Sequence, residues 1–439
     1  MRRIYLLTIA ILFSSSAFSQ NVLSLFKNAN DFFQLMQEEK FHDAYAFFDD
    51  TLKVKLPEKN LQELWGNIIG KCGAVESLEA TGSKAQGQFY AVTVEGKFKN
   101  IDQNFLLGFN SNQKIVGIFI APKRVEQSYT LPVYADTALY IEKPLYIGTG
   151  NNQLAAMLTI PKNTKNFPIV VFVHGSGPND MDETFGPNKP FKDLATGLAS
   201  NGIASIRYVK RTMVYPNEFV GAFTVNKETV KDALAAIELA TKVDGAKKNG
   251  VYVFGHSLGG MLAPKIAMLS PSLGGIILAA APARRLTDLI IEQNKYQFSL
   301  LKDTTSVGKT RLAQILKEVE KGNITKLGNI KADSIIVGLP ASYWVDLNNY
   351  NQVEAAKKLS KIRILIVQGG NDFQVSKTDF DLWEKNLGKR KNVTLKFYPE
   401  LNHLLSKQTE KGTTAQYDIP ASVSVNLKDD LVNWIKDKN

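Results

Sequence analysis

The spacing of apolar residues changes along the 439-residue chain, and the change separates two kinds of structure. In residues 20–122, apolar positions first recur at the spacing of amphipathic helices and then alternate with polar positions, as in strands joined by short turns. The expected helical segments are 32–36, 41–48 and 61–69, and the expected strands are 89–94, 105–109 and 115–120. Helices followed by a meander predict a small α+β domain over residues 20–122.

From residue 154 onward, short runs that are apolar throughout replace this alternation, with helical segments between them. The runs are 169–173, 203–206, 251–254, 276–280, 364–367 and 393–397. Strands of this kind are buried on both faces, which indicates a mostly parallel sheet covered by helices on either side. We therefore predict an α/β domain over residues 140–439. A connector with strand character, residues 123–150, would join it to the first domain.

A long insertion, at about residues 283–355, interrupts this pattern and contains helical segments of its own. It follows the carboxyl end of a strand, the edge at which α/β proteins bind their ligands. The insertion is therefore interpreted as a helical lid, although simple additional structure would produce the same pattern. Its apolar residues would either line an acyl pocket or pack within the insertion, and they include Ile290, Tyr296, Phe298, Tyr343 and Trp344.

The first 19 residues have the composition of a secretory signal peptide. Arg2 and Arg3 precede an apolar run, residues 4–13, that is too short to span a bilayer comfortably. Ala17 and Ser19 fit a small-x-small cleavage site. We expect residues 1–19 to be removed on export to a periplasmic or extracellular location in a bacterium. An uncleaved membrane anchor is the alternative.

Charge and cysteine content bear on which partners the protein binds and on whether disulfides stabilise its fold. The net charge is +11, but the basic residues are scattered rather than clustered, so we expect no nucleic-acid partner. Cys72 is the only cysteine, which excludes an intramolecular disulfide and makes it a candidate for a small buried residue. After the leader, no stretch is apolar enough to predict a transmembrane helix. The sequence leaves the oligomeric state open.

Residues 255–259 have the sequence Gly-His-Ser-Leu-Gly and lie between an apolar run and the start of a helical segment. In this context G-x-S-x-G predicts a nucleophile elbow, a tight turn that exposes the serine hydroxyl. Gly255 and Gly259 permit close approach of the neighbouring chain because glycine lacks a Cβ. Ser257 is therefore the candidate nucleophile, held in an elbow that also contains His256.

A serine nucleophile needs a histidine base and a carboxylate that orients the histidine. In this type of fold the chain order is serine, acid, histidine. His403 is the only histidine after Ser257, and it follows the apolar run 393–397. Asp372 follows the preceding run, whereas its rival Glu400 lies on the same loop as His403. We therefore predict a catalytic triad of Ser257, Asp372 and His403.

A glycine-rich turn at residues 174–178 follows the first central run and is a candidate oxyanion hole. Backbone N–H groups in such a turn stabilise the negative charge of a tetrahedral intermediate. We assign the first donor to Ser176, with Gly175 as the less favoured choice, and the second to Leu258. His174 is expected to be a buried brace for the turn. This chemistry requires no metal and no cofactor, and its partner would be a small molecule, which the resemblance described next identifies as an ester.

These motifs together resemble those of the α/β-hydrolase superfamily, and more narrowly those of bacterial serine esterases. The matching segments are 173–178, 255–260, 368–375 and 401–403, while residues 20–122 are similar in size and element order to a DUF3887 domain. The resemblance implies an α/β-hydrolase fold and hydrolysis of carboxylic esters, usually with short acyl chains. It extends to Asp180, Asp182 and Glu183, which would brace the oxyanion turn.

The chain departs from these relatives after the run at 203–206, where Val209 and Thr212 replace an aspartate and a glycine. This difference affects the expected substrate preference and not the triad. Two other functions stay open at this point. One is a serine peptidase or thioesterase with the same triad, and the other is a catalytically inert hydrolase-fold binding module.

Overall fold

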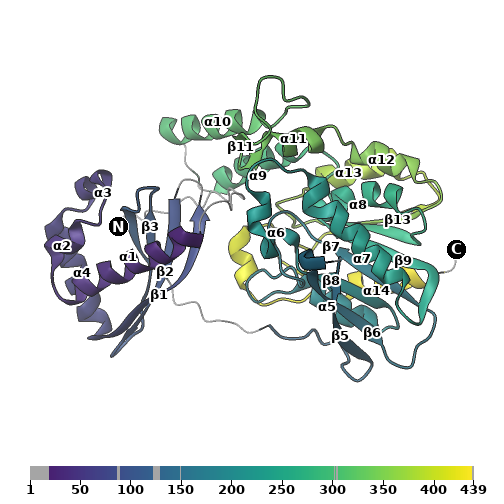
Figure 1. Cartoon of the computed structure of the whole chain (residues 1–439), viewed down its shortest axis with the longest axis horizontal. Coiled ribbons are helices and arrows are strands. Elements are labelled where there is room, and N and C mark those ends of the chain that lie inside the picture. The colour runs from purple at the N-terminus through teal and green to yellow at the C-terminus, as the bar shows by residue number, and fades with distance from the viewer. Residues whose placement is uncertain are drawn as a thin grey trace. The chain divides into compact units, whose positions relative to one another are not determined.

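The computed structural model describes residues 19–437 except for 87–88, 122–128, 149, 301 and 303–304. The predicted signal peptide, residues 1–19, therefore lies outside the described residues apart from Ser19. The chain divides near residue 126 into two units, each with its own secondary structure and core (Figure 1). We describe each unit by itself.

The first unit combines four helices with a four-stranded antiparallel sheet in the order β1-β2-β3-β4. Its elements are α1 (Ser19–Gln37), α2 (Phe41–Tyr45), α3 (Asp50–Lys55), α4 (Glu58–Cys72), β1 (Val75–Gln86), β2 (Phe89–Phe98), β3 (Asn104–Phe109) and β4 (Ile115–Ala121). Helix α3 and strand β1 are absent from the sequence-based prediction. Strand β1 has two register shifts against β2, and these irregularities interrupt the alternation that identifies a strand.

Apolar side chains from α1, α2 and α4 pack on one face of this sheet and form its core. Along β3, Phe105, Leu107 and Phe109 are buried at every second position, as expected for a strand with one covered face. Phe33 of α1 lies on Phe105, with ring centroids 4.8 Å apart. Cys72, at the end of α4, is a buried member of this core, which confirms its predicted role as a small packing residue.

The second unit is built on an eight-stranded sheet in the order β14-β13-β10-β9-β7-β8-β6-β5. The strands are β5 (Tyr140–Ile147), β6 (Leu154–Pro161), β7 (Phe167–Val173), β8 (Ala204–Tyr208), β9 (Ala246–His256), β10 (Gly275–Ala279), β13 (Arg363–Gly369) and β14 (Val393–Tyr398). Strands β14 to β8 are parallel, and β6 is antiparallel to both its neighbours. The predicted α/β architecture is confirmed. Part of the predicted connector is strand β5 of this sheet.

Helices cover both faces of the sheet. On one face, α5 (Pro190–Ala199) and α14 (Val425–Lys436) share a core with alternate residues of the central strands, including Phe172 and Phe254. The helices α7 (Lys231–Thr241), α8 (Leu258–Leu269) and α13 (Lys377–Leu387) also pack on strands but contribute nothing to that core. They therefore lie on the opposite face. The shorter helical segments are η1 (Gly150–Asn152), α6 (Arg211–Val214), η2 (Pro216–Phe219), η3 (Asn226–Val230) and η4 (Thr414–Asp418).

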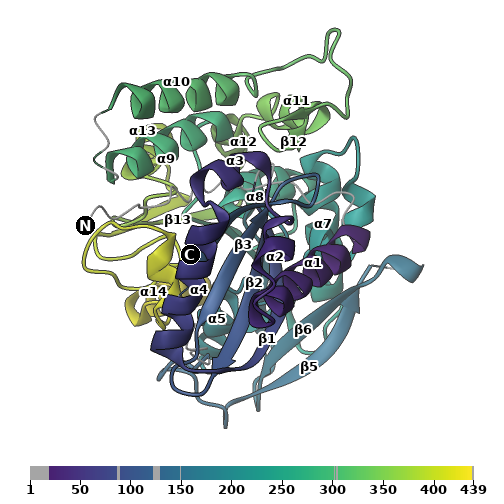
Figure 2. The same cartoon turned by 90° about the vertical axis from the view of Figure 1, so that its left-hand side faces the viewer.

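The predicted insertion forms four helices and a small antiparallel pair of strands among its described residues. These are α9 (Leu286–Leu300), α10 (Ser306–Glu320), β11 (Ile335–Ile336), β12 (Leu339–Pro340), α11 (Ala341–Asn348) and α12 (Gln352–Lys358). Figures 1 and 2 show these helices gathered at one end of the unit, away from the β5–β6 hairpin. Tyr343 and Trp344 are fully buried, so they pack inside and do not line an open pocket.

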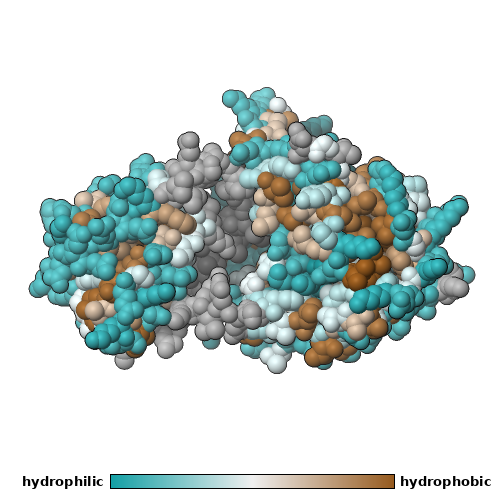
Figure 3. All heavy atoms as spheres, turned by 60° about the horizontal axis from the view of Figure 1, so that its bottom comes forward, coloured by the Kyte–Doolittle hydropathy of each residue, from teal (hydrophilic) through white to brown (hydrophobic). Residues whose placement is uncertain are grey.

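The visible faces of both units are mainly hydrophilic, with apolar side chains in small scattered groups (Figure 3). Among the residues that the structure describes, no helix has the length and apolar character needed to cross a membrane.

Candidate active site

Ser257 lies at the sharp turn between β9 and α8, where its backbone has φ 52° and ψ −117°. A non-glycine residue in this region is strained, which is typical of a nucleophile elbow. The flanking glycines are required by close packing. A Cβ on Gly255 would lie 2.3 Å from the carbonyl oxygen of Gly259, and one on Gly259 would lie 2.2 Å from that of Val173. The sequence Gly-His-Ser-Leu-Gly therefore forms the predicted elbow geometry.

The candidate acid and base are in direct contact. Nδ1 of His403 lies 2.8 Å from Oδ2 of Asp372, which is buried at 1% exposure. The other carboxylate oxygen accepts from the backbone N–H groups of Gln374 at 2.8 Å and Val375 at 2.9 Å. The side chain of Gln368 also donates to Oδ2, at 3.1 Å. These donors hold the carboxylate so that His403 donates its Nδ1–H and keeps Nε2 as the basic nitrogen.

Glu400, the rival acid, lies away from this arrangement. Its side chain is 52% exposed and pairs with Lys407 at 2.9 Å. The base loop instead contacts the elbow through His256, whose ring centroid is 4.7 Å from that of His403. Nε2 of His256 donates to the carbonyl oxygen of His403 at 2.8 Å. The structure thus brings His403 and Asp372 together against the residue that directly precedes Ser257.

His256 is also the cation of a buried ion pair. Its Nδ1 lies 2.8 Å from Oε2 of Glu183, and both residues are at most 3% exposed. Both ring nitrogens lie close to oxygen atoms, an arrangement that favours the doubly protonated form of the ring. Burial alone would lower the pKa of His256, but Glu183 and the His403 carbonyl outweigh burial and raise it. Burial likewise opposes the charge on Glu183, yet His256 holds the pKa of that carboxyl below its usual value.

From its sequence, His256 was expected only as part of the elbow, and this pair was not predicted. The available signal was Glu183, a charged residue in a segment that forms part of the family resemblance. Its neighbours have separate roles. The carboxylate of Asp180 accepts from the N–H groups of Asp182 and Thr184, both at 3.0 Å, while Asp182 pairs with buried Arg207. All three acidic side chains therefore stabilise the loop behind the site.

The oxyanion turn lies against the nucleophile, since a Cβ on Gly175 would be 3.2 Å from the Cβ of Ser257. The N–H of Gly175 donates to Oε1 of Glu183 at 2.6 Å. Gly175, the less favoured donor in the sequence analysis, is therefore already engaged and is removed from the candidates. Among the described residues, no group accepts a hydrogen bond from the N–H of Ser176. The N–H of Leu258 lies in the first turn of α8, where backbone donors lack helical partners.

His174, at the start of the turn, is buried at 1% exposure and donates from Nε2 to the carbonyl oxygen of Asp180 at 2.9 Å. Burial lowers its pKa to about 4. The imidazole is therefore neutral near pH 7 and serves as the structural brace that the sequence suggested.

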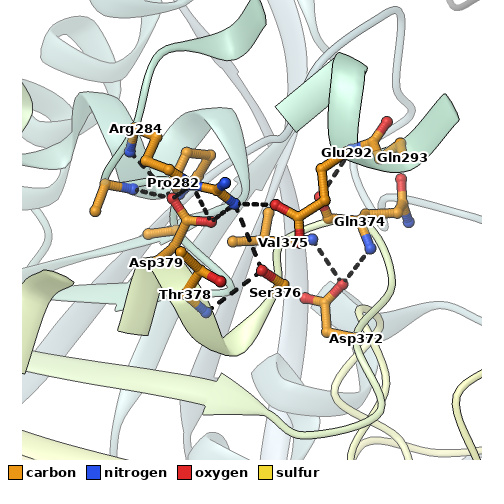
Figure 4. A network of polar contacts seen from close by, with 12 residues as sticks. Pro282, Arg284, Glu292, Gln293, Asp372, Gln374, Val375, Ser376, Thr378 and Asp379 are labelled. Carbon is orange, nitrogen blue, oxygen red and sulfur yellow. Dashed lines mark hydrogen bonds and ion pairs between the residues drawn. The ribbon is translucent and has the colours of Figure 1, made fainter. Parts of the chain in front are cut away.

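A polar network joins the acid loop to the first helix of the insertion (Figure 4). Arg284 donates to the buried carboxylate of Asp379 at 2.7 Å and also pairs with Glu292 of α9. In addition, Gln293 of α9 donates to the carbonyl oxygen of Gln374 at 2.8 Å. The insertion is thus attached within two residues of Asp372. Across the described ranges, no cluster of His, Cys, Asp and Glu residues is suited to hold a metal ion.

Family models and a curated relative agree with this fold. The model described as serine aminopeptidase, S33, matches residues 164–410, more than half of the chain. The model of a protein of unknown function, DUF3887, matches residues 29–118. The chain is 33% identical over 404 residues to esterase EstD of Thermotoga maritima, which covers 92% of this chain and 93% of that protein.

Solved structures of esterases are also similar. Est1E from Butyrivibrio proteoclasticus is 17% identical, with a TM-score of 0.41 over 67% of this chain and 96% of its own. An esterase from Pyrococcus furiosus is 13% identical, with a TM-score of 0.41 over 72% of this chain and 98% of its own.

A mostly parallel sheet with a strained serine at the end of a central strand defines a serine hydrolase of the α/β-hydrolase fold. With the matches above, the chain belongs to the esterases of the α/β-hydrolase superfamily, here preceded by a DUF3887 domain.

The Glu183–His256 pair has a defined pH window of stabilisation. The pKa of Glu183 is lowered from 4.5 on folding, so its contribution is present above pH 4.5 and lost as the pH falls through the folded value. The pKa of His256 is raised from 6.5, so its contribution is present below pH 6.5 and lost as the pH rises through the folded value. The pair therefore makes its full contribution to the free energy of unfolding between pH 4.5 and pH 6.5.

We predict that Glu183→Gln lowers the free energy of unfolding by about 3–5 kcal/mol in this window, because it leaves the buried cation unpaired. The difference from the native protein should shrink toward either side of the window. Urea denaturation measures this difference in the free energy of unfolding. The series should run from about pH 4 to about pH 9, so that it extends beyond the window on both sides. Exposed Glu400→Gln is the matched control and should cost about 1 kcal/mol or less. A loss that is constant across this range would contradict the charged pair.

Proposed function

We propose that the protein is an exported serine esterase that hydrolyses carboxylic esters with short acyl chains. Ser257 attacks the ester carbonyl while His403 takes its proton, and Asp372 stays ionised and orients His403. The observation that carries the proposal is the buried His403–Asp372 contact of 2.8 Å next to a nucleophile elbow. Collapse of the tetrahedral intermediate releases the alcohol and leaves an acyl group on Ser257.

In the second half of the reaction, His403 activates a water molecule that attacks the acyl-enzyme. Both tetrahedral intermediates carry an oxyanion, and the N–H groups of Ser176 and Leu258 are the proposed donors to it. The freedom of the Ser176 N–H among the described residues supports this assignment. The positive end of α8, which begins at Leu258, adds a favourable field.

A peptidase with the same triad is the second candidate, because the matching family model is described as serine aminopeptidase. Esterase action is favoured by the relative named esterase EstD, whose similarity extends over 92% of this chain. The sequence also contains no identifiable group that would grip a peptide terminus. A catalytically inert binding module is disfavoured because the acid, the base and the strained serine are all present.

We predict that Ser257→Ala lowers kcat for p-nitrophenyl acetate by about 10⁴-fold or more, since the nucleophile is lost. A fluorophosphonate probe should label Ser257 in the native protein, as measured by peptide mass spectrometry. Ser270→Ala, at the opposite end of α8, is the matched control and should leave kcat unchanged. Substantial esterase activity in the Ser257→Ala protein, or no adduct on folded native protein, would refute the mechanism.

We also propose that the insertion limits acyl-chain length. Tyr296 of α9 stacks on Phe373, the residue after Asp372, with ring centroids 6.0 Å apart. Both belong to an apolar cluster with Leu404, the residue after His403. Tyr296→Ala should therefore raise kcat/KM for butyrate esters relative to kcat/KM for acetate esters. The expected change is about tenfold, the effect of making room for one more methylene group. A series of p-nitrophenyl esters of increasing length measures this ratio. An unchanged ratio in the folded variant would argue against a limit set by the insertion.

For export, we predict that the chain secreted by a bacterial host begins at Gln20, because Ala17 and Ser19 fit the cleavage rule. N-terminal sequencing of the periplasmic or extracellular protein checks this. Ser19→Phe places a large side chain before the cleavage site and should leave the leader attached. Recovery of the uncleaved native chain with the membrane fraction would instead support an anchor.

A further inference from the structure

The carbonyl groups of the oxyanion turn accept hydrogen bonds from three side chains. Lys210 donates from Nζ to the carbonyl oxygen of Gly175 at 2.7 Å. The side-chain amide of Asn179 lies 3.3 Å from the carbonyl oxygens of Ser176 and Gly177. The hydroxyl of Thr212 donates to the carbonyl oxygen of Gly177 at 3.4 Å. The turn is therefore anchored through three of its carbonyl groups, and none of these contacts uses the N–H of Ser176.

Lys210 is an unusual anchor because it is a charged residue with 2% exposure. Its ammonium group also donates to Oε1 of Glu228 at 2.7 Å, and Glu228 is equally buried. Removing two charges from water is costly, and a hydrophobic pair of similar volume is often as stable. The pair is thus poorly explained by stability alone. The distinguishing feature of the pair is that the ammonium group also donates to a second acceptor, the carbonyl oxygen of Gly175 in the oxyanion turn.

The contact between Lys210 and the Gly175 carbonyl also orients the N–H of Ser176, because both groups belong to the same peptide bond. In a planar trans peptide, the carbonyl of one residue and the N–H of the next point in opposite directions. No cis peptide bond occurs in the described part of the chain. When Lys210 fixes the Gly175 carbonyl, it therefore also fixes the direction of the Ser176 N–H, which lies in the same plane and points away from the opposite edge of the peptide group. Glu183 restrains the preceding N–H of Gly175 at 2.6 Å, so the turn is held at both ends of that residue.

The same network reaches the insertion. Tyr343 of α11 is fully buried, and its hydroxyl donates to Oε2 of Glu228 at 2.7 Å. Burial, together with the Glu228 carboxylate, raises the pKa of Tyr343 well above its usual range, so the hydroxyl stays protonated as a donor. A continuous chain of hydrogen bonds thus runs from Tyr343 through Glu228 and Lys210 to the Gly175 carbonyl.

We propose that Lys210 is a positioning residue that aims the Ser176 N–H at the oxyanion, and that Tyr343 couples the insertion to this donor through Glu228. The proposal rests on the proposed esterase mechanism and adds a residue that the triad and elbow motifs do not include. Thr212 supplies a further donor to the same turn.

Lys210→Met tests the proposal. Loss of an oxyanion donor typically lowers kcat about 100- to 1,000-fold, so misdirection of one should lower kcat about 10- to 100-fold, with little change in KM. Inhibition by a trifluoromethyl ketone, which forms an oxyanion on the nucleophile, should weaken by a similar factor. Active sites are counted by fluorophosphonate titration, so that kcat refers to folded enzyme only. Arg211→Met is the matched control, since Arg211 pairs with Asp232 and makes no contact with the turn.

A second variant separates positioning from stability. Lys210→Met alone leaves Glu228 as an unpaired buried charge, whereas Lys210→Met with Glu228→Gln removes both charges. The double variant should regain thermal stability but keep the low kcat and the weak ketone inhibition. If kcat recovers together with stability, Lys210 is only structural and the proposal is overturned. Tyr343→Phe should lower kcat less than Lys210→Met does, with KM again unchanged, and an unchanged kcat would overturn the coupling to the insertion.

Ser257→Ala distinguishes failure of this proposal from failure of the esterase mechanism. If Ser257→Ala is inactive and Lys210→Met retains native kcat, the mechanism stands and the positioning role of Lys210 falls. If Ser257→Ala is active, the mechanism itself falls.

Discussion

The geometry of the candidate site depends on the contacts that the carboxylate of Glu183 makes. One oxygen accepts from the N–H of Gly175 at 2.6 Å, and the other lies 2.8 Å from Nδ1 of His256. His256 in turn donates to the carbonyl oxygen of His403 at 2.8 Å. Three segments from distant parts of the chain are thereby fixed to one another behind Ser257. In a buried, low-dielectric setting such polar contacts are stronger than they are in water.

The sequence predicted the fold of the second unit and the residues of the candidate triad, but not the polar residues behind them. Ser257, Asp372 and His403 were recognisable because each follows an apolar strand in the expected chain order. Glu183 was expected to brace the oxyanion turn, but its pair with His256 was not predicted, because the ends of β7 and β9 become neighbours only through the sheet order. The contact of Lys210 with the Gly175 carbonyl was missed for the same kind of reason, because it depends on the pairing of β7 with β8. In the first unit, β1 escaped detection because register shifts disturb its alternation.

The insertion is attached to the hydrolase sheet at both ends through polar side chains. Near its start, Glu292 pairs with Arg284, which also pairs with Asp379 beside the acid loop. Near its end, Tyr343 donates to Glu228, and Glu228 pairs with Lys210. Directional contacts of this kind specify a position more narrowly than apolar packing does. The insertion is thus an extension of the scaffold that holds the acid and the oxyanion turn.

The part of the insertion between these two attachments contains an exposed segment. Helix α10 lies in that part, and most of its described side chains are exposed. Substitutions there would alter the exposed surface of the insertion while leaving both attachments intact. Sequence change in this exposed stretch is therefore tolerated more readily than change at the residues that carry the attachments or the candidate site.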